Sequence, residues 1–278
     1  MSAQAAQVPP LNEMKVTSRD NSLLRRVRAV RDGRDDESIY VEGLRLCEEA
    51  LFSNLKIEAV IYSEELARKQ RAATLLEKLG KTSRKIAAVS EKLLASISYT
   101  KTPQGMIVLA KRPANDQKNF KARQPAAPLL VIMHGINNPV NVGAILRTSE
   151  AAGVTGVITT VNTSNPFSAK ALRGAMGSAF RLPIWIGGNY GDIIAWCARR
   201  RIRTICADAN GSKGYTEIDW RVPCALVVGP ESSGLSAGEI ALAKEAVRIP
   251  MRGSVESLNV AVAAGILLYE AARQQGQN

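Results

Sequence analysis

Histidine is almost absent from this chain, because His134 is the only one among 278 residues. Proton transfer at neutral pH is most often assigned to histidine. A Ser-His-Asp triad would depend on this single residue, and a histidine-rich metal site is excluded. A lone histidine that closes an apolar strand is more often structural. Any chemistry is therefore expected to use carboxylates, hydroxyls, arginine or backbone dipoles.

Cysteine is also scarce, and its spacing excludes two further classes of site. The four cysteines never stand two to four residues apart, which excludes a conventional zinc module and gives no sign of a disulfide framework. They are Cys47, Cys197, Cys206 and Cys224. We expect reduced core cysteines in a cytoplasmic protein, and no bound metal.

Long hydrophobic runs and targeting signals are lacking. The longest uncharged stretch, residues 125–145, contains Asn137 and Asn138 and is not expected to span a membrane. Residues 1–10 have no basic flank before an apolar core, so no secretory signal is expected. Glu13 and Asp20 argue against an organellar transit peptide. These features favour a cytoplasmic location without a membrane partner.

Positive charge is abundant. The net charge is +12 and the isoelectric point is near 9.8. A cationic surface concentrates polyanions and speeds their capture, which favours a nucleic-acid partner. Solubility alone, a membrane surface or an acidic protein are alternatives that charge does not exclude.

The first part of the chain is expected to form a small α/β unit over residues 21–112. Residues 1–20, with two adjacent prolines and no apolar period, predict a mobile tail. Five arginines around Leu23, Leu24, Val27 and Val30 predict a basic amphipathic helix that ends near Gly33. The other expected elements are a helix over Val41–Leu51, a strand over Ala59–Tyr62, a helix over Glu64–Leu79 with Gly80 as C-cap, a strand over Ile86–Val89, a helix from Ser90 and a strand over Gly105–Ala110.

A proline- and lysine-rich linker is expected over residues 113–127, and a second unit over residues 128–278. Apolar strands separated by helices predict a mostly parallel sheet with helices on both faces. Ligands bind such sheets beyond the carboxyl ends of the strands. The strands are expected at Leu129–Met133, Val154–Thr160, Leu182–Ile186, Ile202–Ala207, Ala225–Val228 and Val247–Pro250, and the helices at Val142–Ala152, Ser168–Met176, Asn189–Arg200 and Leu258–Arg273.

Three segments at strand ends are rich in small and polar residues: Asn138–Thr148, Val228–Ser236 and Ile249–Val260. Gly229 and Gly234 have the spacing of a phosphate loop, but Leu235 stands where its lysine should be, so a P-loop nucleotidase is rejected. The first strand–helix turn also lacks a GxGxxG pattern, which makes a nicotinamide-binding unit a weak alternative.

Taken in order, the three segments resemble the signature motifs of the SpoU branch of knotted RNA methyltransferases. The first motif matches from Asn141 to Arg147, the second over 229–231 and 234–236, and the third from Ile249 through Ala263. Pro230 and Ser232–Ser233 depart from the asparagine and glycine that are commoner there. Residues 22–110 more loosely resemble the substrate-binding domain, similar to ribosomal protein L30e, that precedes many members.

The resemblance implies S-adenosylmethionine as cofactor, a C-terminal trefoil knot and a homodimer formed through the second unit. It places the cofactor against backbone atoms near Gly229, Ile249, Met251 and Leu258. Small glycines and apolar side chains suit close main-chain contacts with a ligand. Core packing is the alternative for the last three residues.

The resemblance also implies the residues that act on RNA. The guanidinium fork of Arg147 suits a phosphate beside the target ribose. The family proposal that this arginine is the base fits less well, since free arginine keeps its proton up to about pH 12. Glu231 is expected to orient Asn141 or Arg147, or to take the proton. Ser257 and Asn259 are expected to donate hydrogen bonds to loops or RNA. Helix capping is the alternative for Asn141, Glu231 and Ser257.

The basic helix of the first unit is expected to face phosphates through Arg25, Arg26, Arg28 and Arg31. A solvated basic face is the alternative. The leading hypothesis is a ribose 2′-O-methyltransferase that acts on structured RNA, with 23S-type ribosomal RNA favoured over transfer RNA. A catalytically silent RNA-binding or ribosome-assembly factor is the second class, and a nucleotide-dependent α/β enzyme the third.

Overall fold

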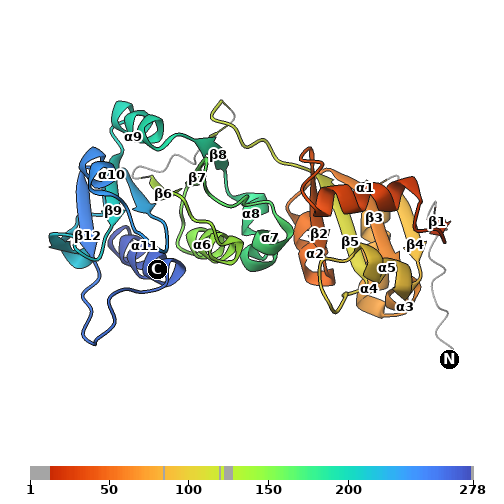
Figure 1. The fold of residues 1–278 in the computed structure, drawn as a ribbon. Coiled ribbons are helices and arrows are strands. Elements are labelled where there is room, and N and C mark those ends of the chain that lie inside the picture. Colours follow the sequence, from red (N-terminus) through yellow and green to blue (C-terminus); the bar gives the residue numbers. More distant parts are fainter. Residues whose placement is uncertain (1–12, 84, 119, 122–127, 277–278) are drawn as a thin grey trace. The chain divides into compact units, whose positions relative to one another are not determined.

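A computed structural model describes residues 13–83, 85–118, 120–121 and 128–276. The chain forms two compact units, one running to Pro113 and the other beginning at Ala114 (Figure 1). Among the described residues, none of the helices combines the length and apolar character that crossing a bilayer requires.

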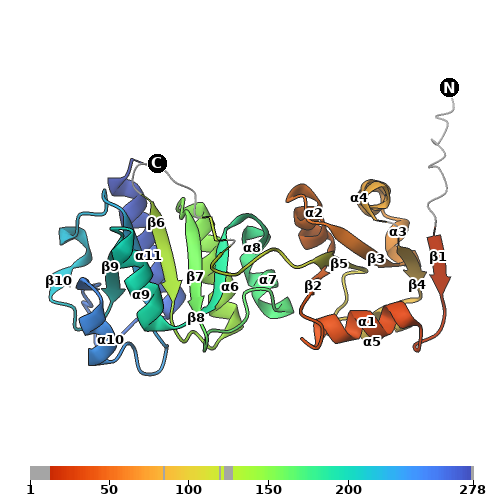
Figure 2. The ribbon, with the colours of Figure 1, turned by 90° about the horizontal axis from the view of Figure 1, so that it is seen from above.

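The first unit is a five-stranded sheet between two helical layers. The strand order is β1-β4-β3-β5-β2, in which β5 runs antiparallel to both β2 and β3. Figure 2 shows α1 and α5 on one face and α2 and α4 on the other. The elements are β1 (Glu13–Val16), α1 (Ser22–Arg31), β2 (Ser38–Glu42), α2 (Leu44–Phe52), β3 (Ile57–Ser63), α3 (Glu64–Ala67), α4 (Gln70–Thr82), β4 (Ile86–Val89), α5 (Glu91–Ile97) and β5 (Met106–Lys111).

Three predictions for this unit are wrong in detail. The expected tail is shorter, because Glu13–Val16 pairs in parallel with β4; residues 1–12 lie outside the described residues. The helix predicted from Val41 begins only at Leu44, since Val41 is a strand residue paired with Val108. Gly80 is not a C-cap but lies inside α4.

The second unit is a seven-stranded, wholly parallel sheet with the order β10-β12-β9-β11-β6-β7-β8. The buried apolar runs in β6 and β11 explain their central place, because both faces are covered by helices. Its elements are β6 (Leu129–Met133), α6 (Pro139–Ala151), β7 (Gly156–Thr160), α7 (Ala169–Ala175), α8 (Ser178–Arg181), β8 (Ile184–Gly188), α9 (Tyr190–Arg199), β9 (Arg203–Ala207), β10 (Lys213–Gly214), a 3-10 turn (Tyr215–Glu217), β11 (Cys224–Val228), α10 (Ala237–Leu242), β12 (Glu245–Arg248) and α11 (Val260–Gln274).

The predicted fold class is confirmed: a mostly parallel sheet with helices on both faces follows a smaller α/β unit. One face is covered by α9 and the other by α6 and α11, which pack against each other. The trefoil knot stays a prediction. Part of the expected linker, residues 119 and 122–127, lies outside the described residues.

Candidate active site

The first two motifs meet at the carboxyl edge of the parallel sheet. β6 and β11 are neighbours in register, with Met133 beside Val228, so the loops that follow them start side by side. The amide of His134 donates to the carbonyl of Val228 at 2.9 Å. The ring of Pro230 stands 3.0 Å from the position that a Cβ on Gly135 would take. The proline that departs from the family pattern therefore packs against the first loop.

The third motif is joined to the first by a side-chain hydrogen bond. Asn259 Nδ2 donates to Asn141 Oδ1 at 3.3 Å. Asn141 is buried in the first turn of α6, whose N-cap is Asn138, so the capping alternative for Asn141 is wrong. Asn259 is itself the N-cap of α11, and its Oδ1 accepts from the Ala261 amide at 2.9 Å. Ser257 is therefore not the cap, and its side chain is exposed.

The loop after β12 has the composition of a ligand cradle. Ile249, Met251 and Leu258 are half-buried and not core residues, so the core-packing alternative is wrong for them. From Met251 to Leu258, all of which the structure describes, no backbone amide or carbonyl makes a hydrogen bond within the chain. These backbone groups are exposed and free to pair with a ligand, and the half-buried apolar side chains beside them suit the apolar part of such a ligand.

Gly229 has a packing reason to be glycine. A Cβ there would lie 2.8 Å from Leu235 Cγ and 3.1 Å from the Leu235 amide. The loop after β11 therefore folds back on its own first residue, and only a glycine leaves room there for Leu235. The residues expected to hold S-adenosylmethionine thus fit such a ligand on chemical grounds.

Two of the expected catalytic side chains are not brought into contact with the Asn141–Asn259 pair. Glu231 is exposed in the loop after β11. Arg147 is exposed on α6, six residues beyond Asn141, which is about 9 Å along the helix axis. Within the described part of the chain neither makes a hydrogen bond or ion pair. Glu231 therefore contacts neither Asn141 nor Arg147 within the subunit, and its role in orienting them or in taking the proton stays a prediction.

Sequence reasoning missed a link between His134 and Glu239. His134 Nε2 lies 2.8 Å from Glu239 Oε1, and the His134 ring packs on Tyr190 with centroids 4.6 Å apart. The other carboxylate oxygen of Glu239 accepts from the amide and hydroxyl of Ser236, the N-cap of α10. The end of β6 is thus fastened to the end of the second motif. The Ser-x-x-Glu spacing of a capping box was the available signal.

Loss of the contact between His134 and Glu239 is expected to weaken cofactor binding more than turnover. The Ser236 amide first, then the Ser236 hydroxyl and the His134 ring, hold the pKa of Glu239 below its usual value. A carboxyl group whose pKa is lower in the folded than in the unfolded protein stabilises the fold at pH values above its unfolded pKa. This stabilisation is lost as the pH falls through the folded pKa. We therefore expect His134→Ala to cost about 1 kcal/mol of unfolding free energy at pH 7, and less below pH ~4.

Calorimetric titration with S-adenosylmethionine and urea unfolding between pH 7 and pH 3 measure both effects. His134→Gln is the matched control, since its amide retains a donor for Glu239. Equal cofactor affinity in the alanine variant and the natural protein would show that the link does not support the loop.

The basic helix is not the open phosphate surface that was expected. Arg26 Nη2 bonds Glu58 at 2.6 Å and Ser38 at 2.7 Å. Arg31 Nε bonds Asp32 at 2.7 Å, and Arg28 Nη2 donates to a backbone carbonyl. These three side chains are committed within the unit. Of the four, only Arg25 is exposed on α1 with a side chain that makes no hydrogen bond or ion pair to a described residue.

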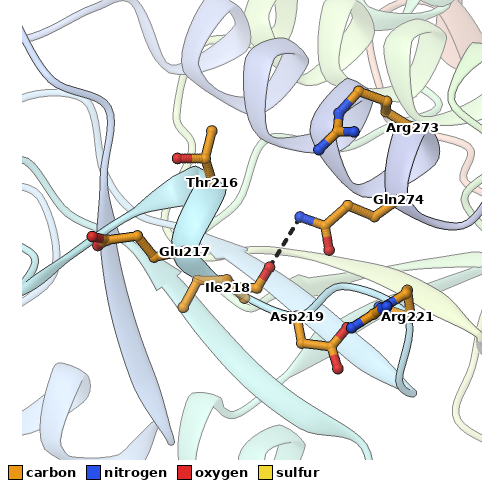
Figure 3. Close-up of a pocket in the computed structure, with 7 residues that line it drawn as sticks. All are labelled: Thr216, Glu217, Ile218, Asp219, Arg221, Arg273 and Gln274. Atoms are coloured by element: carbon orange, nitrogen blue, oxygen red, sulfur yellow. Dashed lines mark hydrogen bonds and ion pairs between the residues drawn. The ribbon is translucent and has the colours of Figure 1, made fainter.

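A cavity of about 490 Å³ lies elsewhere in the second unit (Figure 3). The residues that line the cavity lie just before β11 and at the end of α11. The cavity is therefore at the opposite end of β11 from Gly229. Gln274 Nε2 donates across it to the Ile218 carbonyl at 3.0 Å. Arg221 is paired with Asp219 at 2.8 Å, and Arg273 with Glu270 at 2.8 Å. The cavity therefore offers no uncommitted arginine for a phosphate.

The four cysteines are buried and unpaired. Burial raises the pKa of Cys197 to about 12, which makes a poor nucleophile and metal ligand. Within the described residues, no group of three or more His, Cys, Asp and Glu side chains is arranged to hold a metal ion.

Comparison with known proteins finds a matching family for each of the two units. Residues 128–269 match the model of the SpoU rRNA Methylase family, and residues 23–108 match the MRM3-like substrate binding domain. A 23S rRNA (guanosine-2′-O-)-methyltransferase, RlmB, of Bordetella pertussis is 32% identical over 219 residues, 77% of this chain and 89% of that protein. An uncharacterized tRNA/rRNA methyltransferase of Synechocystis, slr1673, is 30% identical over 94% of both chains.

Among solved structures, the SpoU methyltransferase AviRb from Streptomyces viridochromogenes, in complex with AdoMet, superposes with a TM-score of 0.82 and 27% identity. The match covers 93% of this chain and 99% of that one. An AdoMet-bound rRNA methyltransferase from Sinorhizobium meliloti gives a TM-score of 0.80 at 30% identity, covering 94% and 98% of the two chains.

Proposed function

Because the chain belongs to the SpoU rRNA methylase family, we propose that it methylates a ribose 2′-hydroxyl of large-subunit ribosomal RNA with S-adenosylmethionine as the donor. The observation that carries this proposal is the Asn141–Asn259 hydrogen bond. It holds the first and third motifs together at the edge of the sheet where parallel α/β folds bind ligands.

The cofactor is held by the loops after β11 and β12. The backbone near Gly229 and Met251 supplies donors and acceptors, and Ile249 and Leu258 supply apolar contacts. When bound, S-adenosylmethionine supplies a methyl group on a positively charged sulfur. His134, Glu239 and Pro230 fix the loop after β11 against the end of β6, so the cradle is organised before binding.

Arg147 holds the RNA. With the cofactor bound, methylation would require the ribose hydroxyl to face the methyl group and to give up its proton. Such a transfer needs the attacking oxygen and leaving sulfur in line, so positioning dominates. The exposed guanidinium of Arg147 suits a bidentate grip on a phosphate next to that ribose. Glu231 is the exposed carboxylate of the second motif, and we assign to it the role of accepting the proton of the ribose hydroxyl.

We also propose that the second unit forms a homodimer, which brings Arg147 of one subunit to the cofactor loops of the other. Exposed apolar side chains on two helices that pack against each other support the dimer. Val262 and Tyr269 on α11 are 52% and 56% exposed, and Val140 on the adjacent α6 is 45% exposed. Large apolar side chains gathered on packed helices mark interaction surfaces. Light scattering at micromolar concentration should give twice the monomer mass; a monomer would contradict the proposal.

Ribosomal RNA is favoured over transfer RNA because the Bordetella relative is named for 23S rRNA and because a substrate-binding unit precedes the methylase unit. The Synechocystis relative carries both substrates in its name, so transfer RNA is the second candidate. A cytoplasmic location follows from the proposed substrate.

Mapping of ribose methylation across total RNA, from cells with and without the gene, tests the function directly. We expect one 2′-O-methyl group of large-subunit RNA to disappear. Loss of a transfer-RNA methyl group instead would favour the second candidate. Titration calorimetry with S-adenosylmethionine adds a check: a folded protein that binds no cofactor would indicate a silent RNA-binding factor.

A further inference from the structure

The last helix of the second unit is fastened at its end to the segment that leads into β11. Gln274, the final residue of α11, donates through Nε2 to the Ile218 carbonyl at 3.0 Å (Figure 3). Its Oε1 accepts from the Trp220 amide, also at 3.0 Å. The next residue, Gln275, donates through Nε2 to the Trp220 carbonyl at 2.8 Å. These three hydrogen bonds, here the glutamine latch, pair side-chain amides with the main chain.

Both sides of the glutamine latch are fixed by other contacts. Glu270 is only 8% exposed, and it accepts from Gln274 Nε2 at 2.7 Å. Arg273 holds the pKa of Glu270 below its usual value, so this carboxylate only accepts and settles which end of the Gln274 amide is the donor. On the other side, Trp220 is fully buried, and its indole N–H donates to the Tyr215 carbonyl at 3.1 Å. The latch therefore joins two well-held parts of the unit.

Packing alone fixes the position of α11 along its axis loosely. Residues 263–265 of α11 are alanine, alanine and glycine. A Cβ on Gly265 would meet only Thr148 Cγ2 of α6 within 4 Å, at 3.6 Å. Such small residues make shallow ridges, which resist the sliding of one helix along another weakly. Near its start, α11 is joined to α6 by the Asn259–Asn141 hydrogen bond, which is long at 3.3 Å. The latch is the stronger attachment.

The position of α11 decides where one cofactor loop ends. Asn259, the N-cap of α11, directly follows Leu258. The helix has 15 residues and is about 22 Å long, so a shift of its end is passed to its start. β11 runs in the opposite direction, from the latched segment towards Gly229. The latch therefore ties together the far ends of the two elements that carry the cofactor loops.

We propose that Gln274 and Gln275 are positioning residues for the S-adenosylmethionine site. Through α11 they hold Leu258 and Asn259 in the place relative to Gly229 that the cofactor needs. Without the latch, α11 takes several positions along its axis, and only one of them binds the cofactor. Affinity then falls with the fraction of molecules in that position, whereas the loaded enzyme keeps its turnover. The inference deepens the proposed function, on which it rests.

Substitution of the two glutamines tests the latch. Calorimetric affinity for S-adenosylmethionine is expected to fall about five-fold in Gln274→Ala and about ten-fold in Gln274→Ala/Gln275→Ala, because fewer molecules hold the binding position. At saturating cofactor and RNA, kcat should stay within about two-fold of the natural value. Gln274→Met keeps the length of the side chain without its hydrogen bonds, so its affinity should fall as in Gln274→Ala. Circular dichroism checks that each variant is folded.

Gln70→Ala is the matched control. Gln70 is exposed at the start of α4 in the first unit, and its side chain makes no hydrogen bond to a described residue. Its loss removes the same amide and should leave cofactor affinity unchanged. Equal affinity in folded Gln274→Ala and Gln70→Ala would overturn the proposal. A loss confined to Gln274→Ala, with Gln274→Met unaffected, would assign the effect to packing and also overturn it.

Nuclear magnetic resonance of the cofactor-free protein gives a second readout. With nitrogen-labelled asparagine, the side-chain amide of Asn259 reports its hydrogen bond to Asn141, and its signal is assigned by its absence from Asn259→Asp. This signal should move in Gln274→Ala and stay in place in Gln70→Ala. An unmoved signal would confine the change to the end of α11 and overturn the proposal. If the natural protein binds no S-adenosylmethionine, the proposed function fails, and the Asn259 signal still decides whether the latch positions the start of α11.

Discussion

Arg147→Ala is expected to lower kcat for RNA methylation about 100-fold, the cost of a misplaced nucleophile. The cofactor dissociation constant should change by less than two-fold, since Arg147 is assigned to the RNA phosphate and not to the cofactor. The side chain is exposed on α6 and makes no bond to any described residue. A stability effect larger than about 0.5 kcal/mol is therefore not expected, and the loss belongs to the RNA complex. Single-turnover methyl transfer, with calorimetry for the cofactor, measures the two quantities separately.

Arg199→Ala supplies the matched control. Arg199 is exposed in the last turn of α9, on the face of the sheet opposite α6, and its loss removes the same charge. It should leave kcat unchanged. Arg147→Lys keeps the charge but not the planar fork, so its kcat should lie between those of the alanine variant and the natural protein. A fully active Arg147→Ala would remove Arg147 from the mechanism.

Mixed dimers test where Arg147 acts. If it reaches the partner's cofactor loops, Arg147→Ala mixed with a Gly229→Trp variant should recover activity that neither possesses alone. Recovery requires a dimer and a site shared between subunits. An inactive mixture of folded, exchanging dimers would place Arg147 and the loops in one subunit.

The strands of the second unit could be predicted because their chemistry is local. β6 and β11 are unbroken apolar runs, and such runs are typical of strands covered on both faces. β1 and β10 have four and two residues, too few for a period, and their pairing partners lie far away in the chain. The helix predicted from Val41 began too early because an apolar stretch fits strand and helix alike.

The site could be predicted only as far as its motifs. The resemblance supplied Asn141 and Asn259, but their hydrogen bond joins residues 118 positions apart, which no local pattern gives. The arginines of α1 show the opposite case. Their number predicted a phosphate surface, yet Arg26 is neutralised by Glu58, a residue brought to it only by the tertiary fold.

Gly143 shows why a motif glycine can matter without touching a ligand. It lies within α6, where alanine would ordinarily stabilise a helix by up to about 1 kcal/mol. Here a Cβ would stand 3.0 Å from Gly174 Cα and 3.1 Å from the Ala175 amide, and would also collide with the Ala171 carbonyl oxygen. These are backbone atoms, so α6 and α7 would have to move apart.

Gly143→Ala is therefore expected to destabilise the second unit by about 2–3 kcal/mol, as overpacked cores do. Methyl transfer should fall with it, because α6 carries both Asn141 and Arg147. All three tryptophans lie in this unit, so tryptophan fluorescence during urea unfolding reports its stability alone. Gly191→Ala in α9 is the control, since nothing lies within 4 Å of the added methyl group. Should both variants unfold at the same urea concentration, the close approach of α6 and α7 does not constrain the fold, and the glycine must instead serve the ligand.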